Sequence, residues 1–63
     1  MTAIAFSQEH QFREYSAAAA SDAWQALRNA ADLERQGDRE SAQCCRNAAA
    51  DHFRAAAFFR RLI

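Results

Sequence analysis

Proline, valine and lysine are absent from this sequence of 63 residues, and glycine occurs once, at Gly37. Proline and glycine are the residues that break helices most strongly, whereas β-branched residues such as valine favour strands. Isoleucine is confined to Ile4 and Ile63, near the two ends of the sequence. These absences argue against a β-sheet and predict long helices.

The charges show no excess of one sign, because eight acidic residues balance eight basic ones. Non-specific affinity for nucleic acid comes from neutralising phosphates, so a net charge of zero does not favour that function. All eight basic residues are arginine. This has two explanations, a GC-rich genome or a need for bidentate and stacking contacts at an interface.

Long apolar runs are also missing, and none approaches the roughly 20 residues that span a bilayer. The start MTAIAFSQEH lacks the basic region and the apolar core of a signal peptide. Cys44 and Cys45 are adjacent and would point about 100° apart on a helix, which argues against a disulfide between them. We therefore expect a soluble, cytoplasmic protein in a reducing compartment, with no membrane contact.

Alanine, the strongest helix former, accounts for seventeen residues. The strongest break is Gln36-Gly37-Asp38, where Gly37 suits the left-handed end of one helix and Asp38 suits the N-cap of the next. So short a turn makes two helices antiparallel. We predict an all-α fold, an antiparallel helical hairpin.

The whole of residues 1–63 forms one domain in this interpretation. The first helix is predicted over about 7–36, with Ser7 as its cap and Glu9 in its first turn, and the sequence leaves open whether residues 3–6 add a further turn. The turn takes residues 36–38, and the second helix is predicted over about 39–62.

Each predicted helix carries a seam with steps of three and four residues, the spacing of coiled-coil packing. Most central seam positions are small, which lets helix backbones approach closely. The seams consist of Phe12, Ser16, Ala19, Ala23, Ala26, Ala30 and Leu33 on the first helix, and of Ala42, Cys45, Ala49, His52, Ala56, Phe59 and Ile63 on the second.

Further apolar residues flank both seams, and a wide apolar stripe suits contact with two neighbouring helices. A domain this small also needs a staple or a partner. We therefore expect a homodimer that forms an antiparallel four-helix bundle, with the two hairpins arranged either syn or anti. The predicted core and dimer contacts are Phe12, Tyr15, Ala19, Ala23, Ala26, Leu27, Ala30, Leu33, Cys45, Ala49, His52, Ala56 and Phe59.

No catalytic set of residues stands out, because a Gly-rich phosphate loop, zinc-type spacing and a usable Ser–His pair are all missing. His52 could serve as a metal ligand or a pH switch, but Cys45 lies about 10 Å away along the helix, too far to share an ion within one chain. A hydrogen-bonded core histidine is the simpler interpretation. We expect no enzyme activity, metal or cofactor.

The aromatic residues that fall outside the seams are the strongest indication of function. Trp24, Phe53 and Phe58 lie off or at the edge of the apolar stripes with arginine nearby, and such residues make binding hot spots. The alternative interpretation is that the crossing of the two helices, or a dimer partner, covers these aromatic residues. The predicted partner-binding residues are Trp24, Arg28, Phe53, Arg54, Phe58 and Arg61.

In its length, its alanine-rich seams and its Gln36-Gly37-Asp38 turn, the chain resembles the Rop-type plasmid copy-number regulators. These are helical hairpins that dimerise into four-helix bundles and bind RNA. No RNA-contacting motif matches residue by residue. In size and composition the chain is also similar to short hairpins made early by phages, some of which disable a host protein such as a quorum-sensing transcription factor.

The leading hypothesis is therefore a homodimeric adaptor or inhibitor that binds a host protein, such as a transcription regulator. The first alternative is a Rop-like RNA binder that uses Arg54, Arg60 and Arg61, a basic end diluted by acids such as Asp51. The second alternative is a purely structural bundle subunit whose aromatic residues are all buried.

Overall fold

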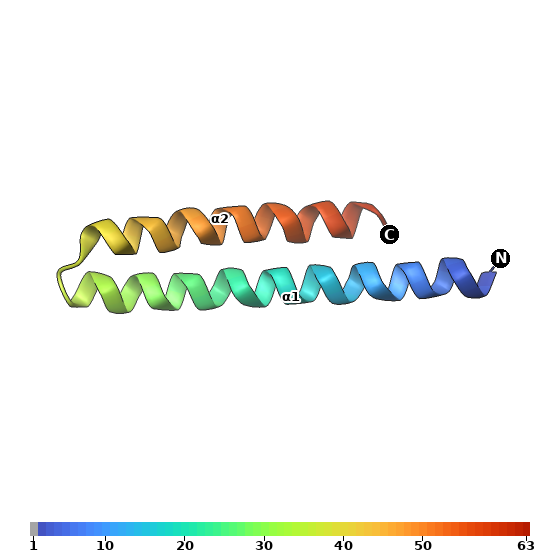
Figure 1. Cartoon of the computed structure of the whole chain (residues 1–63), viewed down its shortest axis with the longest axis horizontal. Coiled ribbons are helices and arrows are strands. Elements are labelled where there is room, and N and C mark those ends of the chain that lie inside the picture. Colours follow the sequence, from blue (N-terminus) through green and yellow to red (C-terminus); the bar gives the residue numbers. More distant parts are fainter. Residues whose placement is uncertain (1) are drawn as a thin grey trace.

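The computed structural model describes the backbone of residues 2–63 and the side chains from residue 8 onward. Helix α1 spans Thr2–Arg35 and helix α2 spans Arg39–Arg61, and the two lie side by side and antiparallel (Figure 1). The Cα trace measures 54 × 13 × 9 Å, a single layer of two helices. The predicted all-α hairpin is confirmed.

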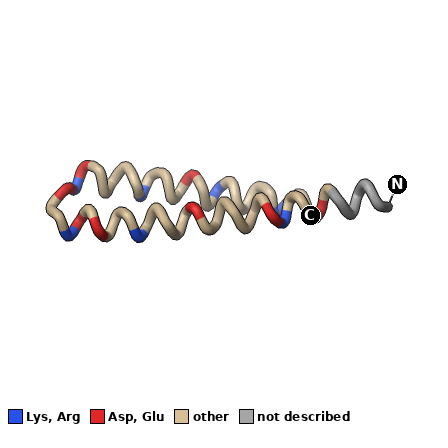
Figure 2. Tube along the Cα trace, turned by 60° about the horizontal axis from the view of Figure 1, so that its bottom comes forward, with Lys and Arg blue, Asp and Glu red and all other residues tan. Residues whose placement is uncertain are grey.

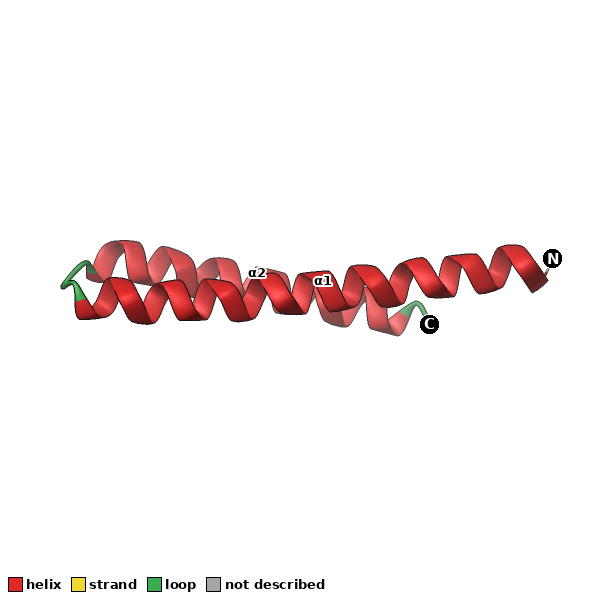
Figure 3. Ribbon diagram, turned by 90° about the horizontal axis from the view of Figure 1, so that it is seen from below, coloured by secondary structure: helices red, strands yellow, loops and turns green. Residues whose placement is uncertain are grey.

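Helix α1 begins at Thr2, earlier than predicted, and ends at Arg35. The segment that follows Thr2 contains no proline or glycine and carries two alanines, so nothing in it stops the helix from extending forward. Ser7 is therefore inside the helix rather than its cap, and Glu9 is not in the first turn. As a result α1 extends beyond the end of α2 (Figure 3).

The turn follows the pattern predicted from its residues. Gly37 has φ +83°, and the Asp38 amide donates to the Leu33 carbonyl at 2.9 Å while the Gly37 amide donates to Glu34 at 3.0 Å. These two bonds form a Schellman motif, which satisfies carbonyls at the end of α1. The turn therefore closes the first helix with its own backbone.

Asp38 caps the second helix from the same turn. Its carboxylate accepts a hydrogen bond from the Ser41 amide at 3.1 Å. This backbone bond, followed by a hydrogen bond from the Ser41 hydroxyl, lowers the pKa of Asp38 below its ordinary value. One residue thus begins α2 directly after Gly37 has ended α1.

The core between the helices consists of small residues at every seventh position. The buried residues are Ser16, Ala23 and Ala30 on α1, and Ala42, Ala49 and Ala56 on α2. The Ser16 hydroxyl donates to the Ala56 carbonyl at 2.9 Å, and in this alignment Ala23 lies level with Ala49. Among the described side chains, none of the large ones is fully buried. The hairpin therefore buries little apolar surface by itself.

Candidate protein-binding surfaces

One wide face of the hairpin, which we name the Trp24 face, presents a row of apolar residues from each helix. Trp24 of α1 packs edge-on against Phe53 of α2, with ring centroids 5.4 Å apart and planes at 86°. Trp24 nevertheless remains 56% exposed. The other members follow at steps of three or four residues, which keep them on the same side of a helix. The face consists of Ala17, Ala20, Trp24, Leu27 and Ala31 on α1, and Ala50, Phe53 and Ala57 on α2.

The two ends of the Trp24 face differ in charge. Near the turn, the guanidinium of Arg46 donates to the Glu34 carboxylate at 2.8 Å and so joins the helices. At the other end an open pocket of about 470 Å³ is lined by Arg13, Ser16, Ala17, Arg60 and Ile63. Within residues 8–63, neither Arg13 nor Arg60 forms an ion pair. This end therefore presents two uncompensated positive charges beside apolar surface.

A cluster of four aromatic rings lies where α2 ends. Phe59 is half-buried and contacts the other three, with centroid distances of 6.3 Å to Phe12, 5.3 Å to Tyr15 and 5.6 Å to Phe58. Tyr15 is 46% exposed and Phe58 is 53% exposed. The cluster thus holds Phe58 in place while leaving half of its side chain open to a partner.

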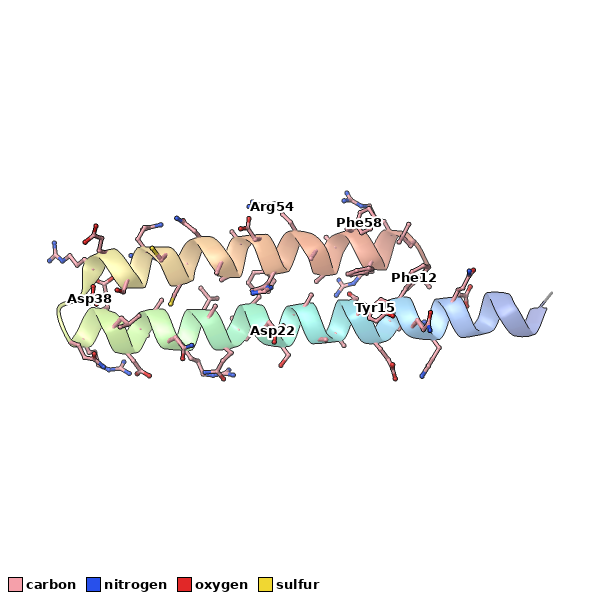
Figure 4. The ribbon with its side chains drawn as sticks, in the orientation of Figure 1. Phe12, Tyr15, Asp22, Asp38, Arg54 and Phe58 are labelled. Atoms are coloured by element: carbon pink, nitrogen blue, oxygen red, sulfur yellow. The ribbon has the colours of Figure 1, made fainter. Side chains whose placement is uncertain are left out.

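Phe58 lies with two arginines on a second surface, which we name the Phe58 surface and define as Arg54, Phe58 and Arg61. Their spacing of four and three residues puts them on one side of α2. Figure 4 shows Arg54 and Phe58 on the side of α2 that faces away from α1. Arg54 is paired with Asp51, whereas Arg61 forms no ion pair among the described residues.

The structure divides the predicted partner-binding residues between these two surfaces. Trp24 and Phe53 meet on the Trp24 face, and Arg28, one turn after Trp24, is exposed and donates to Gln25 at 2.9 Å. The remaining three form the Phe58 surface. Sequence reasoning treated Phe53 and Trp24 as separate aromatic residues and missed their contact. The sequence alone gives no signal for this contact, because a helical pattern does not show which flank of α1 lies beside which flank of α2.

The predicted core and dimer residues occupy three levels of burial. Ala23, Ala30, Ala49 and Ala56 are buried, and Tyr15 is exposed. The half-buried ones are Phe12, Ala19, Ala26, Leu27, Leu33, Cys45, His52 and Phe59. Ser16 and Ala42 are also buried, and both belong to the predicted seams, although neither was among the predicted core and dimer contacts.

The polar residues provide no cluster with evident chemistry in the described part of the chain. Cys44 is exposed and Cys45 is half-buried, and both thiols are free. Within these residues there is no group of three or more His, Cys, Asp or Glu side chains suited to a metal ion. Acidic and basic positions are mixed along both helices (Figure 2), except at the end of α2, where Arg54, Arg60 and Arg61 follow one another with no acidic residue between them.

Comparisons with protein-family models, with curated proteins and with solved structures found no match for this chain. Within the described residues, neither helix combines the length and the apolar character needed to cross a bilayer. The two surfaces themselves are therefore the features that bear on function.

Proposed function

We propose that this protein is a protein-binding helical hairpin, an adaptor or an inhibitor, which contacts its target through the Phe58 surface. The observation that carries the proposal is the 53% exposure of Phe58 on the side of α2 remote from α1. A large apolar side chain in that position contributes little to the hairpin. It is available instead to fill a pocket on another protein.

The surroundings of Phe58 have the character of a binding hot spot. Its ring packs against Phe59, which limits its motion and lowers the entropy that is lost on binding. Arg54 and Arg61 flank it, and arginine around a central aromatic residue is typical of the residues that dominate interfaces. Arg54 is already paired with Asp51, whereas Arg61 forms no ion pair among the described residues, so the surface suits an apolar pocket with an acidic residue on the side that faces Arg61.

The target that this proposal favours is a protein with such an acidic, apolar pocket. The similarity to phage-encoded hairpins makes a host regulatory protein, such as a transcription factor, the first partner class to test. Rop-like RNA binding is the second candidate, and the unpaired Arg60 and Arg61 at the end of α2 favour it. The pairing of Arg54 with Asp51 and the net charge of zero weigh against it.

Affinity capture from a bacterial lysate, with and without nuclease, separates these functions. We expect the parent protein to recover one protein in both conditions, and Phe58→Ala to weaken its binding by about 30-fold or more, as truncation of a hot spot does. Arg28→Ala, an exposed arginine on α1, is the matched control and should bind normally. Equal binding by Phe58→Ala would refute the assigned surface, whereas recovery only of RNA would favour the second candidate.

A further inference from the structure

The core between α1 and α2 is too small to account for a stable fold. A domain of about 60 residues is marginal even with large side chains in its core. Here the buried residues are five alanines and one serine, and Trp24 and Phe53 lie over them on an open face. Trp24 is the most exposed of the large apolar side chains described, at 56%, so burial of the Trp24 face would stabilise this hairpin.

The α1 part of the Trp24 face is nearly symmetric about Trp24. On one side, Ala20 and Ala17 precede Trp24 by four and seven residues. On the other side, Leu27 and Ala31 follow it by three and seven residues. The row ends in opposite charges, because Arg13 lies about 16 Å from Trp24 along the axis and Glu34 about 15 Å on the other side. A row with this symmetry is self-complementary when it meets a second copy running in the opposite direction.

We infer that two copies of this chain pair through their Trp24 faces, with α1 antiparallel to α1 of the partner subunit and the Trp24 side chains at the two-fold axis. The turns then lie at opposite ends of a four-helix bundle. Glu34 of the partner subunit, which keeps its pairing with Arg46 of the partner subunit, comes to the pocket beside Arg13 and Arg60, where its carboxylate also faces these two guanidinium groups.

Charge distinguishes this arrangement from the one with both turns at the same end. In that alternative α1 would face α2 of the partner subunit, and Arg13 and Arg60 of both copies would gather together without a carboxylate. Like charges placed together at an interface oppose association strongly. The antiparallel pairing of α1 with α1 instead divides these arginines between the two ends, and each end receives one Glu34–Arg46 pair in place of two further unpaired arginines.

The face is also large enough for a stable dimer. From Arg13 to Glu34 it is about 32 Å long, and two helices side by side are about 20 Å wide, so it offers about 640 Å² per copy. Standard interfaces bury about 800 Å² per partner, and the side chains add to the flat area. The alanines on this face let the two layers approach closely.

This inference does not depend on the proposed function. Phe58 follows Phe53 by five residues, which turns it about 140° around α2 and away from the paired face. Pairing therefore leaves the Phe58 surface free on both copies. A dimer that binds no target, or a target bound by a monomer, would separate the two proposals.

The first test measures the mass of the protein in solution by light scattering. The fluorescence emission of Trp24 is recorded alongside it over a dilution series. We expect a dimer whose emission shifts to the red on dilution, as Trp24 becomes exposed. Trp24→Ala should weaken dimerisation by about 30-fold or more, and Phe58→Ala, the control with a similar exposure, should dimerise normally. Weak complexes dissociate in the roughly micromolar range, and a concentration of 100 µM is on the order of a hundred times higher. A folded monomer at that concentration would overturn the inference.

The second test determines the arrangement without disturbing the core. In a Cys44→Ser, Cys45→Ala background, Ala17→Cys and Ala31→Cys chains are mixed and oxidised, because both positions are exposed and face each other across the inferred axis. We expect a mixed disulfide between them and none between two Ala17→Cys chains. A disulfide between Ala17→Cys and Ala57→Cys chains would instead place both turns at one end and overturn the antiparallel pairing.

Discussion

Because the seam consists of small residues, we expect a larger side chain at its centre to destabilise the hairpin strongly. Ala23 is 0% exposed and lies level with Ala49, which is 1% exposed, so Ala23→Leu adds three carbon atoms where no space is left. Forcing extra methylenes into a well-packed core costs about 1 to 3 kcal/mol. At about 0.05 to 0.15 kcal/mol per residue, the whole chain is stable by only about 3 to 9 kcal/mol. A single Ala23→Leu change should thus remove a large share of the stability.

The assay is thermal unfolding followed by circular dichroism at a fixed protein concentration. For a domain this small each kcal/mol shifts Tm by about 4 to 8 °C, so we expect Tm to fall by about 5 to 20 °C. Ala18→Leu is the control, because Ala18 is exposed on the same helix and the two residues have similar helix propensity. If both variants unfold within a degree or two of the parent protein, the helices are not closely packed at Ala23 and the description of the core is wrong.

Three further predictions concern the turn and the register. Gly37→Ala should cost about 1 kcal/mol in chemical denaturation, because φ is +83° while no atom lies within 4 Å of the added Cβ; an unchanged midpoint would contradict this. Asp38→Ala should lower Tm at pH 7. Because hydrogen bonds from Ser41 lower the pKa of Asp38, its contribution is present above about pH 4 and is lost as the pH falls through the folded value. The difference between the parent and variant Tm should therefore shrink as the pH falls through the folded pKa of Asp38, and a constant difference would exclude the carboxylate as the cause. Ser16→Ala should cost less than about 1 kcal/mol in urea titrations, because the lost hydrogen bond to Ala56 is partly offset by the better helix propensity of alanine; a cost above about 2 kcal/mol would show that this bond matters more.

The helices and the turn could be predicted from sequence because local chemistry determines them. Gly37 and Asp38 act on their immediate neighbours, and both perform the predicted roles. The start of α1 could not be predicted in the same way. A serine both caps helices and occurs inside them, and only the residues before Ser7 decide between the two. Those residues contain no breaker, and α1 starts at Thr2.

The candidate surfaces could be predicted only in part, because they depend on which flank of α1 lies beside which flank of α2. A helical pattern shows that Trp24 lies off its seam and that Phe53 lies at the edge of another. It does not show that the two flanks share one side of the hairpin and bring the rings to 5.4 Å. The Glu34–Arg46 pair was missed for the same reason, since its members are twelve residues apart across the turn.

The repeat of small residues every seven positions has a consequence for how the two helices find their alignment. If α2 slid by seven residues along α1, about 10 Å, small residues would again face small residues. The seam thus permits several alignments of similar packing quality and does not choose among them. The three residues between Arg35 and Arg39 make that choice, because a connection so short can reach only one of them. An insertion at Gly37 would consequently produce a mixture of sliding states even with every helical residue unchanged, so the information that specifies this hairpin is concentrated in its turn.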